Sequence, residues 1–175
     1  MSVEMNAAAS EGDLELIKDL HLQGHPWDEE TYYEAATSGH IHIMKYLNYN
    51  ECPWRKNLGG LCEDVAIEGH LNALKYLVYL GCPIEDPDNN LYECLAENNR
   101  LDIMKYLYYE CQLCIEDDTI ENIMFSAASE DYVDIVQWLH EYLGYEFSEE
   151  VCDIATKCEC TKVIDYIQHV KNRDS

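Results

Sequence analysis

The sequence repeats one short pattern, in which a pair of small residues, a Gly-His turn and a Leu-rich segment follow each other in fixed order. Residues 66–83 carry it most fully, as AIEGHLNALKYLVYLGCP, and residues 36–47 and 96–107 carry it again. The first apolar residue after each turn serves as a marker, and the markers are Leu14, Ile41, Leu71, Leu101, Val133 and, weakly, Thr161. Successive markers lie 27, 30, 30, 32 and 28 residues apart. A period of this length predicts six copies of one helix-turn-helix unit.

In each unit, apolar residues follow the marker at two, three and six residues, as in Ile41, Ile43, Met44 and Leu47. These offsets fit a helix with a broad buried face, whereas a strand would show alternation. This segment is therefore predicted to be the second helix of each pair. The first helix is expected to be shorter and to contain two small or apolar residues that let another helix approach closely. These pairs are Ala8-Ala9, Ala35-Ala36, Val65-Ala66, Leu95-Ala96 and Ala127-Ala128.

The turn between the two helices is predicted to need one residue with positive φ. The residues at this position are Gly12, Gly39, Gly69, Asn99, Asp131 and Glu159. Gly adopts positive φ freely, and Asn and Asp tolerate it better than other residues. Glu159 does not fit, so we expect the last unit to be a degenerate cap. His40 and His70 follow the turn Gly, where an imidazole can hydrogen-bond free backbone groups.

A second column of residues lies five positions after each marker. It contains Asp19, Tyr46, Tyr76, Tyr106, Trp138 and Tyr166. We expect this side chain to pack against the preceding unit. The polar Asp19 then suits the first unit, which has no predecessor to pack against.

The motifs Gly69-His70-Leu71, Leu74-Lys75-Tyr76-Leu77 and Gly81-Cys82-Pro83 resemble the short ankyrin repeats of giant viruses of amoebae and of some protists. The resemblance covers about residues 6–170. It implies an all-α, ankyrin-type helical solenoid of about six repeats in a single domain, residues 1–175. The repeats would span about residues 4–28, 29–55, 56–85, 86–116, 117–147 and 148–171, with the first and last as caps. Because the Thr-Pro-Leu-His opening is absent and the period is mostly below about 33 residues, the β-hairpins are expected to be reduced to loops.

Charge is the most informative surface property of the chain. The 11 basic and 35 acidic residues give a net charge of −24. Such a surface repels nucleic-acid backbones and anionic lipid and attracts basic partners. The predicted partner-binding row on the first helices contains Tyr33, Glu34, Glu63, Asp64, Glu93 and Phe125, with Cys94 and Ser126 beside them. Stacked repeats would bring this row onto one concave surface, and the alternative is that its acids confer solubility alone.

Trp27 and Trp54 each follow a Pro in the loop that leaves a repeat. We expect these rings to pack against the next repeat, and we also retain them as candidate binding anchors because exposed Trp often serves that role.

No apolar run approaches the roughly 18 residues of a membrane span, and the N-terminus lacks the features of a signal peptide. The protein is therefore expected in the cytoplasm, that of a host cell if it is viral. Nine Cys is an odd number, and Cys52 and Cys82 occupy equivalent places in the repeat. We interpret the cysteines as mostly reduced, small core residues and not as a disulfide framework.

Motifs for catalysis or metal binding are weak. Residues 111–114 form one Cys-x-x-Cys, and Cys158 and Cys160 lie close together, but a structural zinc site usually needs two spaced pairs. The sequence contains no phosphate-binding Gly loop, Gly-x-Ser-x-Gly or His-Glu-x-x-His motif. We therefore predict no catalytic residue, no metal site and no cofactor.

Two functional hypotheses follow from the sequence. The favoured one is a non-enzymatic, monomeric protein-protein interaction module that binds a partner with a basic face through its acidic concave surface. The alternative is an acidic nucleic-acid mimic that occupies a DNA- or RNA-binding protein. Neither hypothesis involves a membrane or direct nucleic-acid binding. A small enzyme or metal protein is the least supported class.

Overall fold

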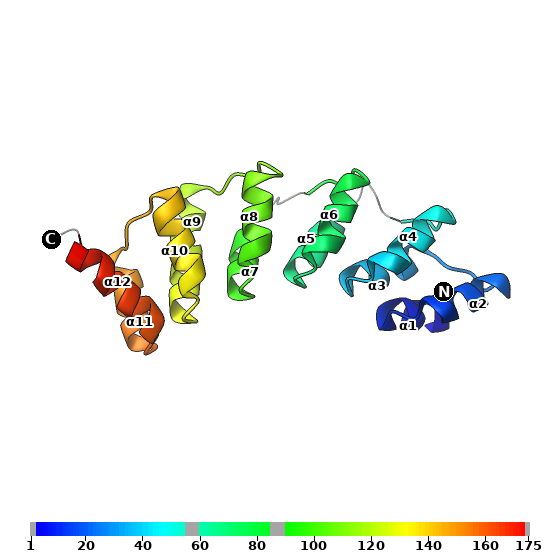
Figure 1. The fold of residues 1–175 in the computed structure, drawn as a ribbon, viewed down its shortest axis with the longest axis horizontal. Coiled ribbons are helices and arrows are strands. Elements are labelled where there is room, and N and C mark those ends of the chain that lie inside the picture. The colour runs from blue at the N-terminus through cyan, green and yellow to red at the C-terminus, as the bar shows by residue number, and fades with distance from the viewer. Residues whose placement is uncertain (1–2, 55–59, 85–89, 174–175) are drawn as a thin grey trace. The chain divides into compact units, whose positions relative to one another are not determined.

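The computed structural model describes residues 3–54, 60–84 and 90–173, in which the chain forms twelve α-helices and no strand (Figure 1). The helices are α1 (Val3–Glu11), α2 (Leu14–Leu22), α3 (Glu29–Thr37), α4 (Ile41–Tyr49), α5 (Leu61–Ile67), α6 (Leu71–Tyr79), α7 (Leu91–Glu97), α8 (Leu101–Tyr109), α9 (Asp117–Ser129), α10 (Val133–Leu143), α11 (Glu149–Lys157) and α12 (Thr161–Arg173). Every marker residue predicted from the sequence is the first residue of a helix. The all-α prediction is confirmed.

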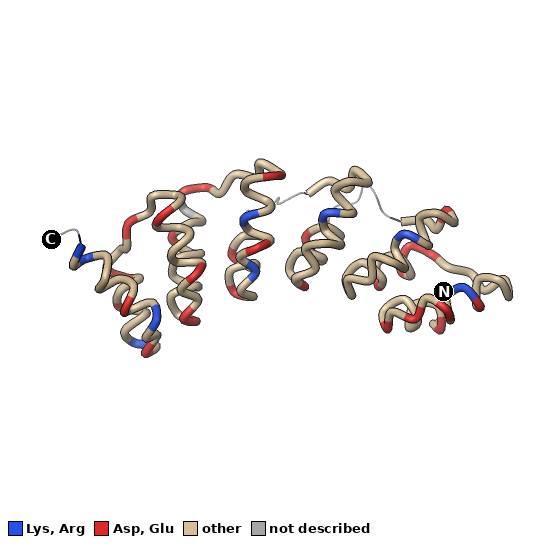
Figure 2. Tube along the Cα trace, viewed as in Figure 1, with Lys and Arg blue, Asp and Glu red and all other residues tan. Residues whose placement is uncertain are grey.

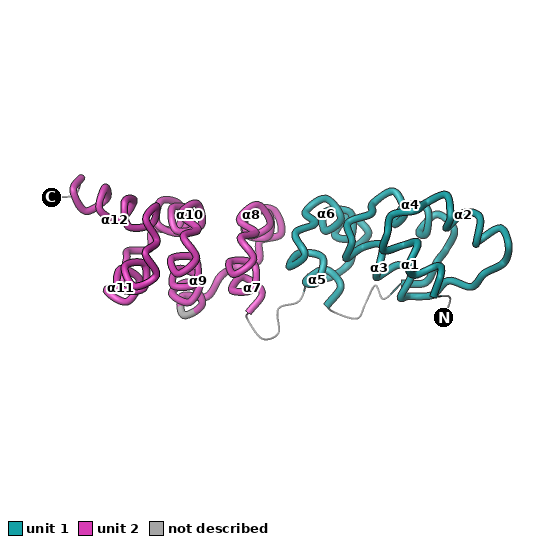
Figure 3. Tube along the Cα trace, turned by 90° about the horizontal axis from the view of Figure 1, so that it is seen from below, with its two compact units in different colours: residues 1–87 teal, residues 88–175 magenta. Residues whose placement is uncertain are grey.

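The chain divides into two compact units (Figure 3). Unit 1 is residues 1–87 and holds α1 to α6, and unit 2 is residues 88–175 and holds α7 to α12. In both units the two helices of a pair pack against each other. Successive first helices also pack together, α1 on α3 and α3 on α5 in unit 1, and α7 on α9 and α9 on α11 in unit 2. Within each unit, this packing of adjacent pairs is a helical repeat-like arrangement.

The second helices bury the face that their periodicity predicts. In α4 the side chains of Ile43, Met44 and Leu47 are fully buried. Each such side chain contributes roughly 1.5–3 kcal/mol relative to an exposed one, so this face is the main reason that the helix docks. Leu16 in α2 is an exception, since its side chain is 41% exposed.

The small pairs of the first helices are buried as predicted. Ala8, Ala9, Ala35 and Ala36 are at most 1% exposed, and they lie on α1 and α3, which pack against each other. Side chains of this size let the two helices approach closely. The small pair is therefore a packing feature of the repeat.

All six predicted turn positions have positive φ. The angles are 83° at Gly12, 74° at Gly39, 89° at Gly69, 55° at Asn99, 59° at Asp131 and 56° at Glu159. Glu159 was expected not to fit this turn, and that expectation was wrong, because its positive φ matches that of the other turns. Hydrogen bonds from Glu159 N to Thr156 O (3.2 Å) and from Cys160 N to Ala155 O (2.9 Å) close it. These contacts hold Glu159 in a conformation that costs a non-Gly residue roughly 1–2 kcal/mol.

His40 and His70 explain why Gly occupies the turns of unit 1. The His40 ring lies against Gly12, and its Nε2 is 2.9 Å from the Ser10 carbonyl oxygen in the last turn of α1, so His40 bonds a helix-end backbone group as predicted. It makes no cap hydrogen bond to its own helix, α4. A Cβ atom on Gly12 would lie 2.8 Å from the His40 ring, and one on Gly39 would lie 2.6 Å from the His70 ring. These Gly residues thus supply both positive φ and space for the histidine of the next pair.

Within each unit, members of the column five residues after the marker pack on the preceding helix pair, as predicted for Tyr46, Tyr76 and Trp138. The Tyr46 ring makes edge contacts with His21 and Trp27, with centroids 6.2 and 6.3 Å apart. Lys45 Nζ lies 5.8 Å from the centre of the Tyr76 ring. In unit 2, Trp138 Nε1 donates a hydrogen bond of 3.1 Å to Tyr109 Oη. Aromatic contacts of this kind tie consecutive pairs together within each unit.

The loops of unit 2 agree with the prediction that the β-hairpins are reduced to loops, and the cysteines agree only in part with theirs. In unit 2, the loops at residues 110–116 and 144–148 contain no strand. Residues 55–59 and 85–89, which include two predicted repeat borders, lie outside the described residues. All nine cysteines are free thiols, as expected, but only Cys52, Cys62, Cys82 and Cys160 are buried, so the interpretation of most cysteines as core residues was wrong. No helix among the described residues is both long enough and apolar enough to cross a membrane.

Candidate partner-binding surface

In unit 1, helices α3 and α5 bring predicted row residues together. Tyr33 Oη donates a hydrogen bond of 2.9 Å to Asp64 Oδ2, which joins residues 31 positions apart. The Tyr33 side chain is 37% exposed, and those of Glu34 and Asp64 are half-buried. Glu63 has a local role, because its Oε2 accepts a hydrogen bond of 2.8 Å from Gly60 N at the start of α5. The unit 1 part of the row is thus built on the Tyr33 and Asp64 pair.

The pair also changes the chemistry of Tyr33. Partial burial and the hydrogen bond to Asp64 raise the pKa of the Tyr33 hydroxyl to about 12. A Tyr hydroxyl with the ordinary pKa of 10.0 is already protonated at neutral pH, and the shift extends its donation to the carboxylate toward pH 12. This arrangement leaves the other Asp64 oxygen able to accept a hydrogen bond from a partner.

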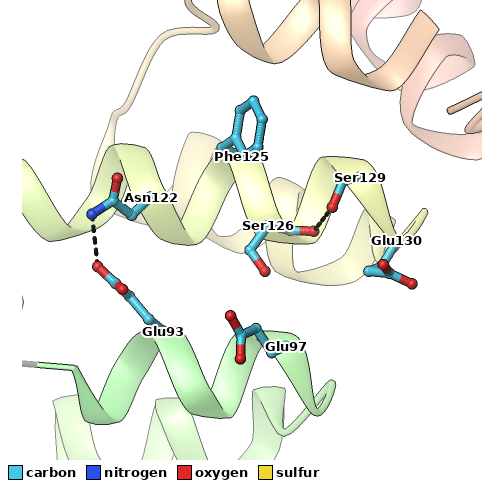
Figure 4. A pocket seen from close by; sticks show the side chains of 7 residues that line it. All are labelled: Glu93, Glu97, Asn122, Phe125, Ser126, Ser129 and Glu130. Carbon is cyan, nitrogen blue, oxygen red and sulfur yellow. Dashed lines mark hydrogen bonds between the residues drawn. The ribbon is translucent and has the colours of Figure 1, made fainter. Parts of the chain in front are cut away.

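In unit 2, the corresponding residues of α7 and α9 surround a hollow of about 520 Å³ (Figure 4). The hollow is lined by Glu93 and Glu97 of α7 and by Asn122, Phe125, Ser126, Ser129 and Glu130 of α9 and its C-terminal end. Asn122 Nδ2 donates a hydrogen bond of 2.7 Å to Glu93 Oε1 and so joins the two helices. In Figure 4 the Phe125 ring points away from the α7 carboxylates. The ring is 41% exposed, which makes it an accessible apolar surface beside an acidic hollow.

The electrostatics of this region follow from a run of the sequence that contains no Lys or Arg. Residues 106–156 contain 13 Asp and Glu and no Lys or Arg. Figure 2 accordingly shows no Lys or Arg on α9 or α10. Neither the net charge nor the predicted row of acids reveals this run, whereas a sliding count of Lys and Arg along the sequence does.

A second hollow, of about 220 Å³, lies between α9 and α11. Its lining combines the buried apolar side chains of Ile120, Met124 and Val151 with polar residues. The polar lining residues are Asp117, Glu121, Tyr145, Glu146 and Ser148. The sequence did not indicate this hollow, because its residues come from α9, from α11 and from the loop before α11, which no motif connects.

Tyr145 holds one side of the second hollow. Its hydroxyl donates a hydrogen bond of 2.5 Å to Asp117 Oδ1. The pKa of Tyr145 is raised to about 12, mainly by this hydrogen bond and to a smaller extent by burial. The loop after α10 is therefore joined to the start of α9.

Trp27 and Trp54 pack inside unit 1. The Trp27 ring stacks on His21 at 3.8 Å, and its contact with Tyr46 of the next pair agrees with the expected packing. The Trp54 ring stacks on Tyr32 at 5.1 Å, within its own repeat. Both Trp side chains are half-buried, so they support the fold whether or not a partner also touches them.

Metal-ligand residues do not converge in the described part of the chain. No group of three or more His, Cys, Asp or Glu side chains there is placed to hold a metal ion. Cys160 Sγ instead lies 3.3 Å from the Ser129 carbonyl oxygen, which is equivalent to the carbonyl that His40 contacts in unit 1.

Comparison with known proteins gives no assignment: no protein-family model matches the chain, and no curated protein matches it significantly. A function must therefore be argued from the residues. The strongest features are the acidic hollow between α7 and α9, the Tyr33 and Asp64 pair, and the run without Lys or Arg.

Proposed function

We propose that the chain is an ankyrin-type repeat module that binds a protein partner with a basic face through side chains of its first helices. The helix pairs, the small-residue packing and the positive-φ turns support the repeat type. One observation carries the functional part: the hollow of about 520 Å³ sets Glu93, Glu97 and Glu130 beside the exposed Phe125 ring. We infer no chemical reaction.

The magnitudes of these interactions suggest how such a surface would work. An exposed ion pair contributes only about 0–1 kcal/mol, so the carboxylates alone would give weak binding. They would mainly increase the association rate and select basic partners, over a Debye length of about 8 Å at physiological salt. Most of the affinity would come from exposed aromatic rings such as Phe125.

A charge-reversal experiment tests the proposal. The row variant carries E34K, D64K and E93K, and the control variant carries D19K, E110K and D165K. The control makes the same change in net charge at exposed positions on second helices or just after one. The tagged full chain would capture proteins from an extract of its native cell, followed by quantitative mass spectrometry at about 0.15 M and about 0.5 M salt.

We expect the wild type and the control to retain a basic protein that the row variant loses. Added salt should also weaken its capture, because the attraction is screened. Equal capture by all three proteins would refute the proposed surface. Displacement of the partner by added polynucleotide would instead favour the nucleic-acid mimic.

A further inference from the structure

Helix α9 has a hollow on each of two opposite sides. Asn122, Phe125 and Ser126 line the hollow toward α7, whereas Ile120, Glu121 and Met124 line the hollow toward α11. With 3.6 residues per turn, these two sets lie on opposite sides of the helix. Phe125 of the first set and Glu121 of the second are exposed and lie one helical turn apart, where the two sets adjoin on the surface of α9. A chain that crosses α9 over these residues would reach both hollows.

The hollow between α7 and α9 suits a guanidinium group. Three carboxylates, from Glu93, Glu97 and Glu130, line it together with two Ser side chains. A guanidinium presents five N–H donors in a planar fork and can bond several such oxygens at once, whereas a lysine ammonium is a point charge. The residues that line this hollow include no Lys or Arg, so no cation of its own lining competes.

The hollow between α9 and α11 has a different character. Ile120, Met124 and Val151 give it an apolar floor, and Tyr145 closes one side. An apolar side chain would cover this floor. The acids Asp117, Glu121 and Glu146 in the same lining disfavour an acidic residue in the approaching segment.

The spacing of the two hollows defines the spacing in the ligand. Their lining residues are centred about six positions apart on α9, which corresponds to about 9 Å along the helix. Packed helices lie 8–10 Å apart, so the hollows on either side of α9 are separated by a similar distance across it. Combined at right angles, the offset of about 9 Å along the helix and the similar distance across it place the two hollows about 13 Å apart. An extended chain covers this distance in about four residues at roughly 3.3 Å per residue.

We propose that unit 2 binds an extended segment of its partner across α9, with an arginine in the α7–α9 hollow and an apolar residue about four positions away in the α9–α11 hollow. This inference rests on the proposed function and names the chemistry of the partner. Charge complementarity with the run of residues 106–156 brings the segment to unit 2. The two hollows then determine which basic segments fit.

A synthetic peptide provides the probe. Acetyl-Gly-Ser-Arg-Gly-Ser-Gly-Leu-Gly-Ser-amide carries the two side chains at the required spacing. It would be titrated into the full ¹⁵N-labelled chain and followed by amide chemical shifts. We expect shifts concentrated in α7, α9 and α11. Replacement of the peptide's Arg by Ala should weaken binding about tenfold, replacement by Lys should weaken it several-fold, and replacement of its Leu by Gly about threefold.

Protein variants locate the contacts. F125A and E97K should each weaken the peptide about tenfold, since one removes the apolar surface and the other reverses a charge of the hollow. The matched control is E110K, an exposed acid of the same unit that lines neither hollow. Because Lys is favourable at the last residue of a helix, E97K is expected to fold, and thermal unfolding checks this.

Three results would overturn the inference. They are equal weakening by E97K and E110K, equal affinity for the Arg and Lys peptides, and chemical shifts spread over both units. Each would indicate general attraction to a negative chain. Failure of the peptide to bind, with the basic partner still captured in the charge-reversal experiment, would also overturn it and leave the proposed function standing.

Discussion

Tyr32 in unit 1 and Tyr92 in unit 2 occupy the same position of the repeat, nine residues before the marker, and both are almost completely buried. Tyr92 Oη donates a hydrogen bond of 2.8 Å to the Leu113 carbonyl oxygen. Tyr32 Oη has no hydrogen-bond partner among the described residues. Equivalent side chains therefore differ in hydrogen bonding, and the partner of Tyr92 lies in the loop after α8.

The buried hydroxyl of Tyr32 lies among groups that disfavour its ionisation. Burial raises its pKa above the usual range, and the neighbouring Tyr76 and the thiols of Cys52, Cys82 and Cys62 raise it further. Burial likewise raises the pKa of Cys52 to about 12, so this thiol stays protonated. In unit 1 the Tyr32 hydroxyl thus has no partner among the described residues, whereas in unit 2 the equivalent hydroxyl of Tyr92 is hydrogen-bonded.

The turns differ between the units in a similar way. Unit 1 uses Gly12, Gly39 and Gly69, and unit 2 uses Asn99, Asp131 and Glu159. In unit 1 a histidine of the next pair occupies the space beside Gly12 and Gly39. In unit 2 a side chain is present instead, and Asp131 Oδ1 accepts a hydrogen bond of 3.0 Å from Val163 N of the next pair. The same backbone turn is therefore joined to the next pair by two different contacts.

The largest predicted effect is at Gly39. Gly39→Ala should lower the free energy of unfolding by about 3 kcal/mol, because it combines an unfavourable φ with a contact of 2.6 Å to His70. Gly24→Ala is the control, with φ of +80° and nothing within 4 Å of the added Cβ. It should cost only about 1 kcal/mol. Urea unfolding followed by circular dichroism measures both, and equal losses would show that the histidine contact is unimportant.

The two tyrosines should respond in opposite directions. Tyr92→Phe removes the hydrogen bond to Leu113 and should lower the free energy of unfolding by about 1–2 kcal/mol. Tyr32→Phe removes an unsatisfied hydroxyl, keeps the stacking on Trp54, and should raise it by up to about 1 kcal/mol. Paired urea titrations test this. Destabilisation by Tyr32→Phe would mean that the hydroxyl is satisfied in solution.

Glu159 tests the turns of unit 2. Glu159→Gly should raise the free energy of unfolding by about 1 kcal/mol, since Gly adopts its φ of 56° without strain. Glu130→Gly, at the C-terminal cap of α9 where φ is −108°, lacks this benefit and serves as a control. Thermal unfolding of both variants is the measurement. No gain at Glu159 would show that its side chain makes a compensating contact.

The smallest effect concerns alkaline pH. Tyr33 in unit 1 and Tyr145 in unit 2 each donate to an Asp and each have a pKa raised to about 12 from 10.0. Between these values the unfolded chain releases the proton and the folded chain keeps it, so stability is full below pH 10 and falls as pH rises toward 12. Tyr33→Phe and Tyr145→Phe should each flatten this fall slightly. Denaturant midpoints across that range measure the change, and unaltered slopes in both variants would contradict it.

Much of the fold could be predicted from local sequence. The markers fall at the first residue of each second helix, because helix starts and apolar periodicity are properties of a few neighbouring residues. The Gly, Asn and Asp turns were predictable for the same reason, since φ depends on one residue. The turn at Glu159 was not predictable in this way, because the backbone hydrogen bonds that close the turn hold Glu159 in a conformation that its residue type disfavours.

The candidate site was predictable only in part. The sequence indicated Glu93 and Phe125 as row residues, and both line the larger hollow. It did not indicate Glu97, Glu130 or Tyr145, because their convergence depends on how neighbouring helices and loops pack. Glu63 belonged to the predicted row but serves in part as a local helix cap, which its spacing from Gly60 could have suggested.

The sequence by itself determined the all-α class, the helix pairs, the turn positions and the strongly negative charge, since each depends on residues close in the chain or on composition alone. Tertiary structure decided which buried groups are satisfied and where side chains from different repeats meet. Tyr92 donates a hydrogen bond to the Leu113 carbonyl oxygen, 21 residues away in the sequence, and Asn122 donates one to Glu93, 29 residues away. Contacts at these separations depend on the packing of whole helices, and no short stretch of sequence encodes that packing.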